Sequence, residues 1–582
     1  MVKMNSLFLI IMFFYITYGC NISKPKSKLL DNSKTNIVKT QKLSISQTLK
    51  ENSHLSVERR ISLYKKLKAE SPKKYNFENE DEFTMYGYSL LWDNNIEEAL
   101  AIFKLIVSEF PNSSNPYDSL GEAYMKSGNI ELAIANYTKS REMNPDNFNA
   151  EDQIERMKYP NKIPKTPAEK FAKVYTIQEY KDDLDQLGKK LIDIHPQALK
   201  FISKNDFWNL IKNKKALITE NTTYSKFIWH CSEIIASINC SHTSMGNFSL
   251  ENEMLPIALR FPLQTRWVNN QLFVIDALNN KNRVAIKDEI VSINGMSVSK
   301  IVAGIYKHIS SQGYVKTSKK HFFNSWATGL IPFALNFPET YKISLKGKEN
   351  PIVLNKAITF KDPIFDKSVD YCKDNLCLQF LNGNKKAVLT VNSFNYYPWN
   401  NLSVFENFMD SSFKKINEKG IENLIIDLRF NHGGSPESSI HLLKYLLDKP
   451  FSYFYSNNQY PKEKETHKPF ENAFKGKLYF IIDGNGKSTT GHFMSIVKDL
   501  KLGTIVGEEL GSNQFCTAGQ TIRRLSNTKL VFYIANAASK TTVTSLLDEV
   551  GILPNYYVTQ SIDDYLNNID TVKDFTINLI EK

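Results

Sequence analysis

The C-terminal third of the chain alternates between continuous apolar runs and amphipathic stretches. The runs at 423–430, 477–483 and 503–509 predict strands, and the segments at 439–447 and after Ser488 predict helices between them. Runs that are apolar throughout are typical of parallel strands whose two faces are both covered by helices. This order therefore predicts right-handed βαβ units around a parallel sheet, which is an α/β fold.

The N-terminal part of the chain carries a repeat of 34 residues. Seven positions recur one period later with residues of the same type. The two sets are Phe83, Tyr86, Gly87, Leu90, Ala99, Phe103 and Pro111, and Tyr117, Leu120, Gly121, Tyr124, Ala133, Tyr137 and Pro145. This pattern is typical of tetratricopeptide repeats. We expect an all-α tetratricopeptide module over residues 76–155, which either holds a protein partner in its groove or is a structural appendage.

The periodicity changes twice between these two regions. The stretch YPNKIPKTPAE at 159–169 has three prolines and marks a linker. Residues 169–245 show helical periodicity, and the last helix predicted there ends just before Ser241 and His242, which places both residues in a loop. Residues 255–355 are predicted to form short strands and turns with one helix at 297–309.

The first twenty residues predict export. Lys3 precedes an uninterrupted apolar run at 7–18, which is too short to span a bilayer and is typical of a signal peptide. The run leads to a glycine and Cys20, which resembles the lipobox of bacterial lipoproteins, where the cysteine is lipidated. The threonine and tyrosine ahead of the glycine depart from that pattern, so ordinary secretion stays open. We expect a protein of the bacterial cell envelope, in the periplasm or on the outer membrane, anchored only by lipid on Cys20 and with residues 21–75 as a tether.

Composition excludes some kinds of partner. With 582 residues, of which 42% are hydrophobic, the chain is long enough for two or three globular domains. Its net charge of +12 is scattered along the chain and forms no basic stripe, so we expect no nucleic-acid partner.

The cysteines beyond Cys20 bear on disulfides and metals. In an oxidising compartment Cys372 and Cys377 can close a small loop, whereas one straight helix cannot bridge Cys231 and Cys240. A zinc site is conceivable, but no recognised ligand spacing supports it, and no metal or organic cofactor is expected. Its ligands would be His230, Cys231, Cys240 and His242.

Two junctions between strands and helices are candidates for chemistry. At one, Gly433 and Gly434 make a turn at a helix start, where backbone N–H groups can face an anion. At the other, Ser488 lies at the first turn of a helix, and the N–H of Thr489 is placed to bind an oxyanion. Serine is also a preferred helix cap, so position alone does not make Ser488 a nucleophile.

Four motifs supply further evidence through a resemblance. The segments at 424–435, 487–492, 506–513 and 548–555 resemble, in order and spacing, the family of tail-specific or C-terminal-processing serine peptidases. IKDEIVSING resembles the degenerate PDZ-like segment of that family, here at 255–355. The resemblance covers roughly residues 175–560 and implies a crotonase/ClpP-like α/β core at 370–565.

The family has two catalytic designs, and the resemblance favours one of them. A Ser-Lys dyad would need a lysine about 25 residues after Ser488, where this chain has Asn513, and Lys487 is no evident substitute. The tricorn-like branch instead uses a Ser-His pair upstream of the PDZ-like segment and an acid near the C-terminus. Ser241 and His242 match the pair.

In that branch the acid corresponds here to Asp548 or Glu549, and both stay open. The design implies acyl transfer. His242 would take the proton of Ser488, and the acid would orient His242 directly or through the Ser241 hydroxyl. The N–H groups of Gly433 or Gly434 and of Thr489 would then stabilise the oxyanion.

Two observations keep other readings open. His492 is a rival base on the same helix, and Gly491 stands where many family members have an acidic residue. The site would then position its substrate differently or be inactive. Besides a peptidase acting on a peptide or protein substrate, we therefore consider an inactive homologue that binds peptides or apolar ligands, and a scaffold that works through its tetratricopeptide module.

Overall fold

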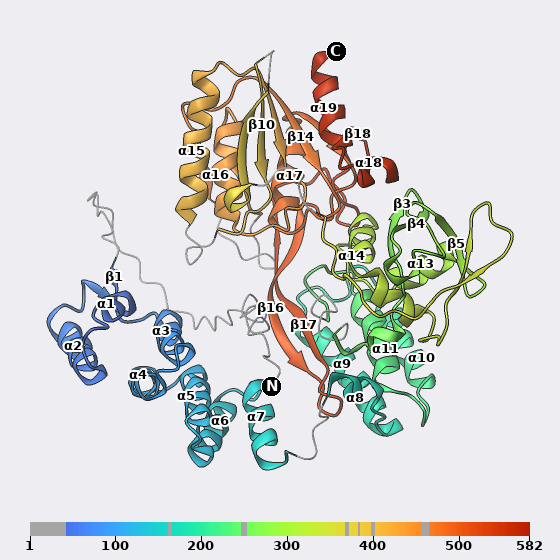
Figure 1. Cartoon of the computed structure of the whole chain (residues 1–582). Coiled ribbons are helices and arrows are strands. Elements are labelled where there is room, and N and C mark those ends of the chain that lie inside the picture. The colour runs from blue at the N-terminus through green and yellow to red at the C-terminus, as the bar shows by residue number, and fades with distance from the viewer. Residues whose placement is uncertain are drawn as a thin grey trace. The chain divides into compact units, whose positions relative to one another are not determined.

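The computed structural model describes residues 42–160, 166–245, 253–366, 372–381, 385–396, 402–455 and 465–582 (Figure 1). The described residues form two compact units that meet in sequence at about residue 165. The predicted signal peptide and Cys20 lie outside the described residues. Among the helices that the structure describes, none is long and apolar enough to cross a bilayer.

The N-terminal unit is built from antiparallel helix pairs. Gly87 in one helix packs on Phe103 in the next, so closely that a Cβ would lie 2.6 Å from the ring, and Gly121 packs on Tyr137 in the same way. The residues that the 34-residue period relates thus make equivalent contacts in both pairs. The helices are α3 (Glu80–Trp92), α4 (Ile96–Glu109), α5 (Ser114–Lys126), α6 (Ile130–Met143) and α7 (Phe148–Lys158).

Part of the segment expected to be a tether is folded. Residues 45–70 form α1 (Ile45–Glu51) and α2 (Val57–Glu70). Leu49 and Tyr64 are fully buried in the core of the helical unit, and the Tyr64 hydroxyl donates to Glu109 at 2.9 Å. The composition of this stretch is polar, but its few large apolar residues fall on one side of each helix and bury against α3 and α4.

The C-terminal unit contains the predicted α/β sheet. Its strand order is β18-β15-β14-β11-β10-β9, and all neighbours are parallel except the edge strand β9. The strands are β9 (Leu376–Phe380), β10 (Lys386–Val391), β11 (Asn423–Asp427), β14 (Lys477–Ile482), β15 (Thr504–Gly507) and β18 (Tyr556–Tyr557).

Helices cover both faces of this sheet, as the continuous apolar strands predict (Figure 1). Leu424 and Ile426 of β11 enter one core with α15 (Leu402–Glu418), α16 (Pro436–Leu446) and α17 (Thr489–Asp499). Ile425, between them, enters a second core on the opposite face with α19 (Thr571–Glu581). The nucleophile candidate and the glycine turn therefore come from neighbouring strands, β14 and β11, at the same edge of the sheet.

The segment from 253 to 366 forms a separate antiparallel sheet with two helices. The predicted helix at 297–309 is observed as α13 (Val298–Tyr306), but the sequence analysis missed the longer α14 (Thr317–Ala334). The strands are β3 (Gln264–Val268), β4 (Gln271–Asp276), β5 (Glu289–Ile293), β6 (Met296–Ser297), β7 (Lys342–Leu345) and β8 (Ile352–Val353).

A long hairpin joins the α/β sheet to the helices that precede it (Figure 1). Its strands are β16 (Phe515–Arg524) and β17 (Val531–Lys540), paired antiparallel along their whole length. The hairpin tip is held by Asp183, a buried carboxylate that accepts hydrogen bonds from the backbone of Asn527 and from the N–H and hydroxyl of Thr528 at 2.6–3.0 Å. The helices to which the hairpin connects the sheet are α8 (Pro167–Ala172), α9 (Ile177–Ile194), α10 (Lys204–Ala216) and α11 (Tyr224–Ser237).

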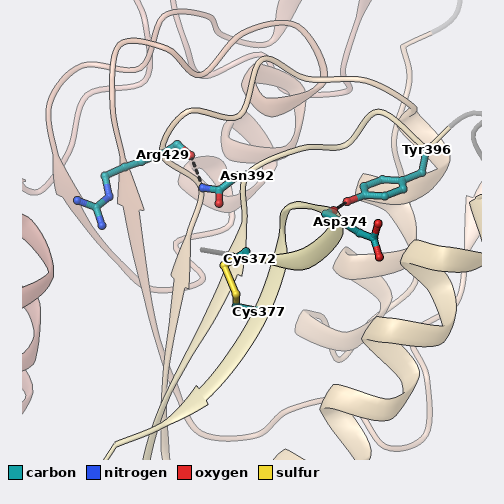
Figure 2. The surroundings of a disulfide bond; sticks show 6 residues. All are labelled: Cys372, Asp374, Cys377, Asn392, Tyr396 and Arg429. Atoms are coloured by element: carbon teal, nitrogen blue, oxygen red, sulfur yellow. Dashed lines mark hydrogen bonds between the residues drawn. A yellow bond between two sulfur atoms is a disulfide. The ribbon is translucent and has the colours of Figure 1, made fainter. Parts of the chain in front are cut away.

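The predicted Cys372–Cys377 disulfide is present (Figure 2). It closes the turn that leads into β9, and Tyr396 donates a hydrogen bond to the carbonyl of Asp374 within that turn. Cys231, Cys240 and Cys516 are free and buried. The disulfide therefore fixes the entry to β9, the edge strand of the α/β sheet.

Removing the carboxylate at the hairpin tip should destabilise the C-terminal unit. Asp183→Ala leaves three donors without an acceptor, and we expect a loss of about 3 kcal/mol in the free energy of unfolding. Asp185→Ala is the control, because this exposed residue of the same helix pairs only with Lys215 and should cost about 0.5 kcal/mol. Urea unfolding of the two variants tests this, and equal losses would contradict it.

Candidate active site

Ser488 occupies a strained position between β14 and α17. Its backbone has φ 53° and ψ −124°, a conformation that residues with a side chain rarely adopt. Its hydroxyl makes no capping hydrogen bond to α17. A serine held on a sharp turn from strand to helix, with its hydroxyl not used as a cap, is typical of an exposed nucleophile.

The glycine turn lies directly against this serine. Gly433 and Gly434 have φ angles of +94° and +141°, and a Cβ on Gly433 would lie 2.7 Å from the Cβ of Ser488. Only glycine permits this approach. The carbonyl of Gly434 accepts a hydrogen bond of 2.5 Å from the Thr489 hydroxyl, which ties the turn to the start of α17.

Asn431 joins the two sides of the site. Its side-chain oxygen accepts the N–H of Gly433 at 2.9 Å and the hydroxyl of Thr490 at 2.8 Å, and its carbonyl accepts the N–H of Lys487 at 3.2 Å. The Gly433 N–H, which was predicted as an oxyanion donor, is therefore already bonded. Thr489 contributes an N–H from the first turn of α17, where backbone donors have no acceptor within the helix.

The loop that carries His242 is bound to the β16–β17 hairpin. Ser244 and Tyr533 exchange backbone hydrogen bonds of 3.0 and 2.8 Å. The Thr243 hydroxyl accepts the N–H of Ala535 at 3.1 Å, and Gln520 donates to the carbonyl of His242 at 2.8 Å. Because β16 also runs past the start of α17, the hairpin brings the histidine to the nucleophile candidate.

Cys516 lies between Ser488 and His242. Its Sγ is 3.6 Å from Ser488 Oγ and 4.0 Å from His242 Nδ1, so the predicted nucleophile and base contact one sulfur atom. Burial raises the pKa of the Cys516 thiol to about 12, so it stays neutral. Ser241 Oγ lies 3.2 Å from the same ring nitrogen of His242, within hydrogen-bonding distance.

His242 is kept neutral by its surroundings. Burial and, to a smaller extent, the charge of Lys487 together lower the pKa of His242 to about 4. Burial also lowers the pKa of Lys487, although Asp483 partly opposes this shift. A neutral imidazole can accept a proton at ordinary pH, as a general base must.

The two acids predicted to complete the site have other surroundings. Asp548 accepts a hydrogen bond of 2.6 Å from Gln514 and pairs with Lys200 at 2.8 Å and Lys540 at 3.1 Å. Burial would raise the pKa of Asp548, but these two lysines lower it. The Glu549 side chain is exposed. Among the described contacts, neither carboxylate bonds to His242. Asp548 is paired with the two lysines instead, and Glu549 points to solvent.

Two positions where the sequence departs from the family have structural explanations. Asn513, at the place of the dyad lysine, donates to the carbonyls of Leu547, Asp548 and Val550 at 2.7–3.3 Å and so holds that loop. A Cβ on Gly491 would lie 2.6 Å from Ser512 Oγ, so an acidic residue does not fit there.

The alternative base and the conceivable metal site receive no support from these contacts. The ring of His492 packs edge-on against Tyr453 and Phe454, at centroid distances of 6.1 and 5.8 Å. Across the described residues no three His, Cys, Asp or Glu side chains gather as a metal site would require, and the thiol of Cys240 contacts the Thr517 hydroxyl instead.

Sequence reasoning missed Cys516 and the connecting role of Asn431. No spacing rule relates residue 516 to 242 or 488, since the three meet only through the pairing of the hairpin. For Asn431 a signal was present, because an asparagine between a buried strand and two glycines often bonds its own turn.

Comparison with known proteins relates the α/β part of the chain to serine peptidases. Residues 385–558 match the model of peptidase family S41. A probable CtpA-like serine protease of Staphylococcus epidermidis is 24% identical over 194 residues, which cover 32% of this chain. That match spans 37% of the relative's length.

Similar folds occur among solved structures. Mature CPAF complexed with lactacystin is 12% identical, with a TM-score of 0.47, and the match covers 70% of this chain and 99% of that one. The photosystem II D1 C-terminal processing protease is also 12% identical, with a TM-score of 0.34 and coverage of 65% and 93%.

The strained backbone at Ser488 should be measurable as stability. Ser488→Gly removes the penalty of the positive φ, and we expect it to raise the free energy of unfolding by about 1 kcal/mol. Ser488→Ala keeps the strain and should change it by less than about 0.5 kcal/mol. Urea unfolding at neutral pH compares them, and a glycine variant no more stable than the alanine variant would show that the turn is unstrained.

Proposed function

We propose that the chain is a serine peptidase that cleaves peptide bonds through an acyl-enzyme, with Ser488 as nucleophile and His242 as general base. The observation that carries this proposal is the convergence of Ser488 and His242 on the Cys516 sulfur, at 3.6 and 4.0 Å, although they are far apart in sequence. The match of the surrounding α/β region to peptidase family S41 supports it.

The first step is attack on the substrate carbonyl. The Ser488 hydroxyl turns from the Cys516 sulfur toward His242, which takes its proton as the oxygen bonds to the carbonyl carbon. The Ser241 hydroxyl, 3.2 Å from His242 Nδ1, orients the imidazole. The imidazolium then returns the proton to the leaving amine, and water releases the acyl group by the same steps in reverse order.

The oxyanion is stabilised at the start of α17. Thr489 supplies its backbone N–H, and the positive end of the helix adds to the field there. The Gly433 N–H already donates to the Asn431 side chain, so the proposal rests on the N–H of Thr489. Lys487 adds a positive charge close to the site, which favours the negatively charged tetrahedral intermediate over the neutral substrate.

Features outside the candidate site support the proposal that this activity lies in the cell envelope. The lipobox-like Cys20 supports export and a lipid anchor, with no membrane-spanning segment needed. The equivalent packing of Gly87 on Phe103 and Gly121 on Tyr137 supports a tetratricopeptide module, which would bind a protein partner or substrate. The antiparallel sheet at 264–353 supports a PDZ-like segment that holds an extended peptide.

Covalent labelling tests the nucleophile and the base. We expect the soluble chain, residues 21–582, to gain one adduct from a fluorophosphonate probe, seen in its intact mass. Ser488→Ala and His242→Ala should lose both the adduct and peptide hydrolysis, a fall of at least about a thousandfold, while still folding. Ser495→Ala is the control, since this buried serine of α17 donates only to the carbonyl of His492 and contacts Thr541. A wild-type chain without an adduct would point to an inactive binding homologue.

The pH dependence of labelling tests the role of His242. Because the pKa of His242 is lowered to about 4, the rate should be flat near neutral pH and fall only as pH drops toward 4, where the base becomes protonated. Lys487→Gln removes a charge that lowers this pKa, so the acid limb should move to higher pH. Lys477→Gln, an exposed lysine of β14, should leave the limb in place. An unmoved limb in Lys487→Gln would exclude the coupling.

A further inference from the structure

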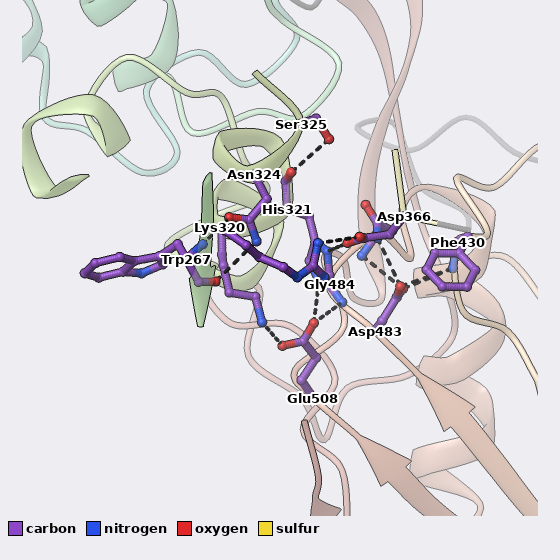
Figure 3. Close-up of polar contacts among 12 residues, drawn as sticks. Trp267, Lys320, His321, Asn324, Ser325, Asp366, Phe430, Asp483, Gly484 and Glu508 are labelled. Atoms are coloured by element: carbon purple, nitrogen blue, oxygen red, sulfur yellow. Dashed lines mark hydrogen bonds and ion pairs between the residues drawn. The ribbon is translucent and has the colours of Figure 1, made fainter. Parts of the chain in front are cut away.

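A buried charge cluster lies where α14 meets the α/β sheet, and the mechanism above does not use it. At its centre, His321 of α14 lies between two carboxylates, as Figure 3 shows. Its Nδ1 is 2.9 Å from Asp366, and its Nε2 makes a short hydrogen bond to Glu508, the residue after β15. All three side chains are buried, with exposed fractions of 10% for His321, 12% for Asp366 and 7% for Glu508.

This geometry requires a charged histidine. A neutral imidazole has one N–H, so one of its nitrogens would face a carboxylate lone pair to lone pair. With both nitrogens against carboxylates, only the imidazolium satisfies both contacts. Burial alone would lower the pKa of His321, but the charge of Glu508 and the hydrogen bond to Asp366 raise it to about 9.

The carboxylates are held in turn by two cations. Lys320 pairs with Glu508, and Arg266 of β3 pairs with Asp366 at 2.7 Å. Other titratable groups face the cluster from the elements packed around it. Asp483, after β14, and His432, after β11, interact with the charge of His321. Tyr306, Tyr557 and Glu509 interact with the charge of Glu508, and Tyr565 interacts with Arg266. The cluster thus connects the 253–366 segment with the ends of neighbouring catalytic strands.

The cluster rests directly on the turn that presents the nucleophile. Gly484 begins that turn, and a Cβ there would lie 2.8 Å from His321 Cδ2 and 2.7 Å from Thr317. The Gly484 N–H points to Glu508 Oε1 at 3.4 Å. The ring and its carboxylate therefore fix the backbone four residues before Ser488.

Asp483, which faces this cluster, also fixes the glycine turn. The Asp483 carboxylate accepts the N–H of Phe430 at 3.2 Å and the N–H of Asn485 at 3.1 Å. Phe430, shown beside Asp483 in Figure 3, leads into the turn that carries Gly433, and Gly433 lies against Ser488. One backbone segment of the site thus starts at Gly484, which contacts His321, and the other starts at Phe430, which is bonded to the residue before Gly484.

We infer that protonated His321 is a positioning residue for the active site, which locks the turn 483–488 in its strained form by bridging Asp366 and Glu508 across the segment boundary. This inference rests on the proposed function for its catalytic consequence. When His321 loses its proton, one of the two contacts is lost and the turn is released, so acylation of Ser488 falls at alkaline pH.

The sign of the pH effect on stability follows from the same pKa. The pKa of His321 is raised from its usual 6.5 to about 9 in the folded chain. The contribution of the His321 charge to stability is therefore complete below about pH 6.5 and is lost as the pH rises through about 9. Deprotonation of His321 lowers the labelling rate at alkaline pH, whereas protonation of His242 lowers it at acid pH. The effects of the two histidines can therefore be separated in one profile of labelling rate against pH.

The decisive variant is His321→Gln in the soluble chain 21–582. Glutamine can donate from its amide nitrogen but cannot meet two carboxylates with two donors on opposite sides. We expect fluorophosphonate labelling to slow roughly 10- to 100-fold and to lose its fall near pH 9. Hydrogen exchange at 483–488, read by mass spectrometry, should become faster. His441→Gln is the matched control, because His441 of α16 pairs with Asp410 of α15, away from the site.

A second variant guards against misfolding of the first. Glu508→Gln keeps His321 but removes the larger attraction for its proton, so the alkaline fall should move to lower pH. Unchanged labelling and unchanged exchange in His321→Gln, or an unmoved alkaline fall in Glu508→Gln, would overturn the inference. If the wild type takes no label, the proposed function fails, and the exchange rate at 483–488 in the two variants decides the positioning role by itself.

Discussion

The site depends above all on the pairing between the His242 loop and the β16–β17 hairpin. Two reciprocal backbone hydrogen bonds between Ser244 and Tyr533 fix the register of this pairing, and the Thr243 hydroxyl and Gln520 side chain add one bond each on either side. Because register in a paired strand sets the direction of every side chain, a slip of one residue would turn His242 away from Ser488. The contacts of Asp183 at the hairpin tip and of Cys516 at its base keep the strand in place at both ends.

Next to this pairing, the backbone of Ser488 is strained and several neighbouring residues hold it in place. The positive φ at Ser488 is unfavourable, and it persists because neighbouring groups over-determine it. Asn431 bonds both Gly433 and Thr490, the Gly434 carbonyl takes the Thr489 hydroxyl, and the charge cluster at His321 holds the other end of the turn. The α/β sheet supplies the common edge at which these segments meet.

The sequence predicted the parts of this arrangement that depend on local pattern. The strands β11, β14 and β15 and the helices α16 and α17 follow from apolar runs and amphipathic periodicity, and the disulfide follows from the short spacing of its cysteines. Helix α14 was not predicted from the sequence because it is apolar on most sides and therefore shows little helical periodicity. It also has Gly329 and Pro332 near its end. Helix α1 was not predicted because the composition around it is that of a tether, whereas the stretch ERRISLYKKLKA within α2 does suggest a helix.

Contacts between residues that are far apart in the sequence could not be predicted from local patterns. Nothing in the spacing of Lys200, Lys540 and Asp548 shows that they pair, and so the acid expected at His242 could not be assigned from sequence. The same holds for the histidine of α14, whose two carboxylate partners come from separate segments. Ser488 could be proposed as the nucleophile only because the resemblance to a peptidase family added to an otherwise ordinary helix start.

The order of the segments along the chain has a consequence for biosynthesis. The histidine precedes the serine by 246 positions, and the strand that holds the histidine loop comes last, at Tyr533 and Ala535. A ribosome-bound or partly translocated chain that ends before this strand has no template for the loop. Ser488 and His242 therefore come together only when nearly the whole polypeptide has emerged, so an unfinished chain does not contain the proposed site.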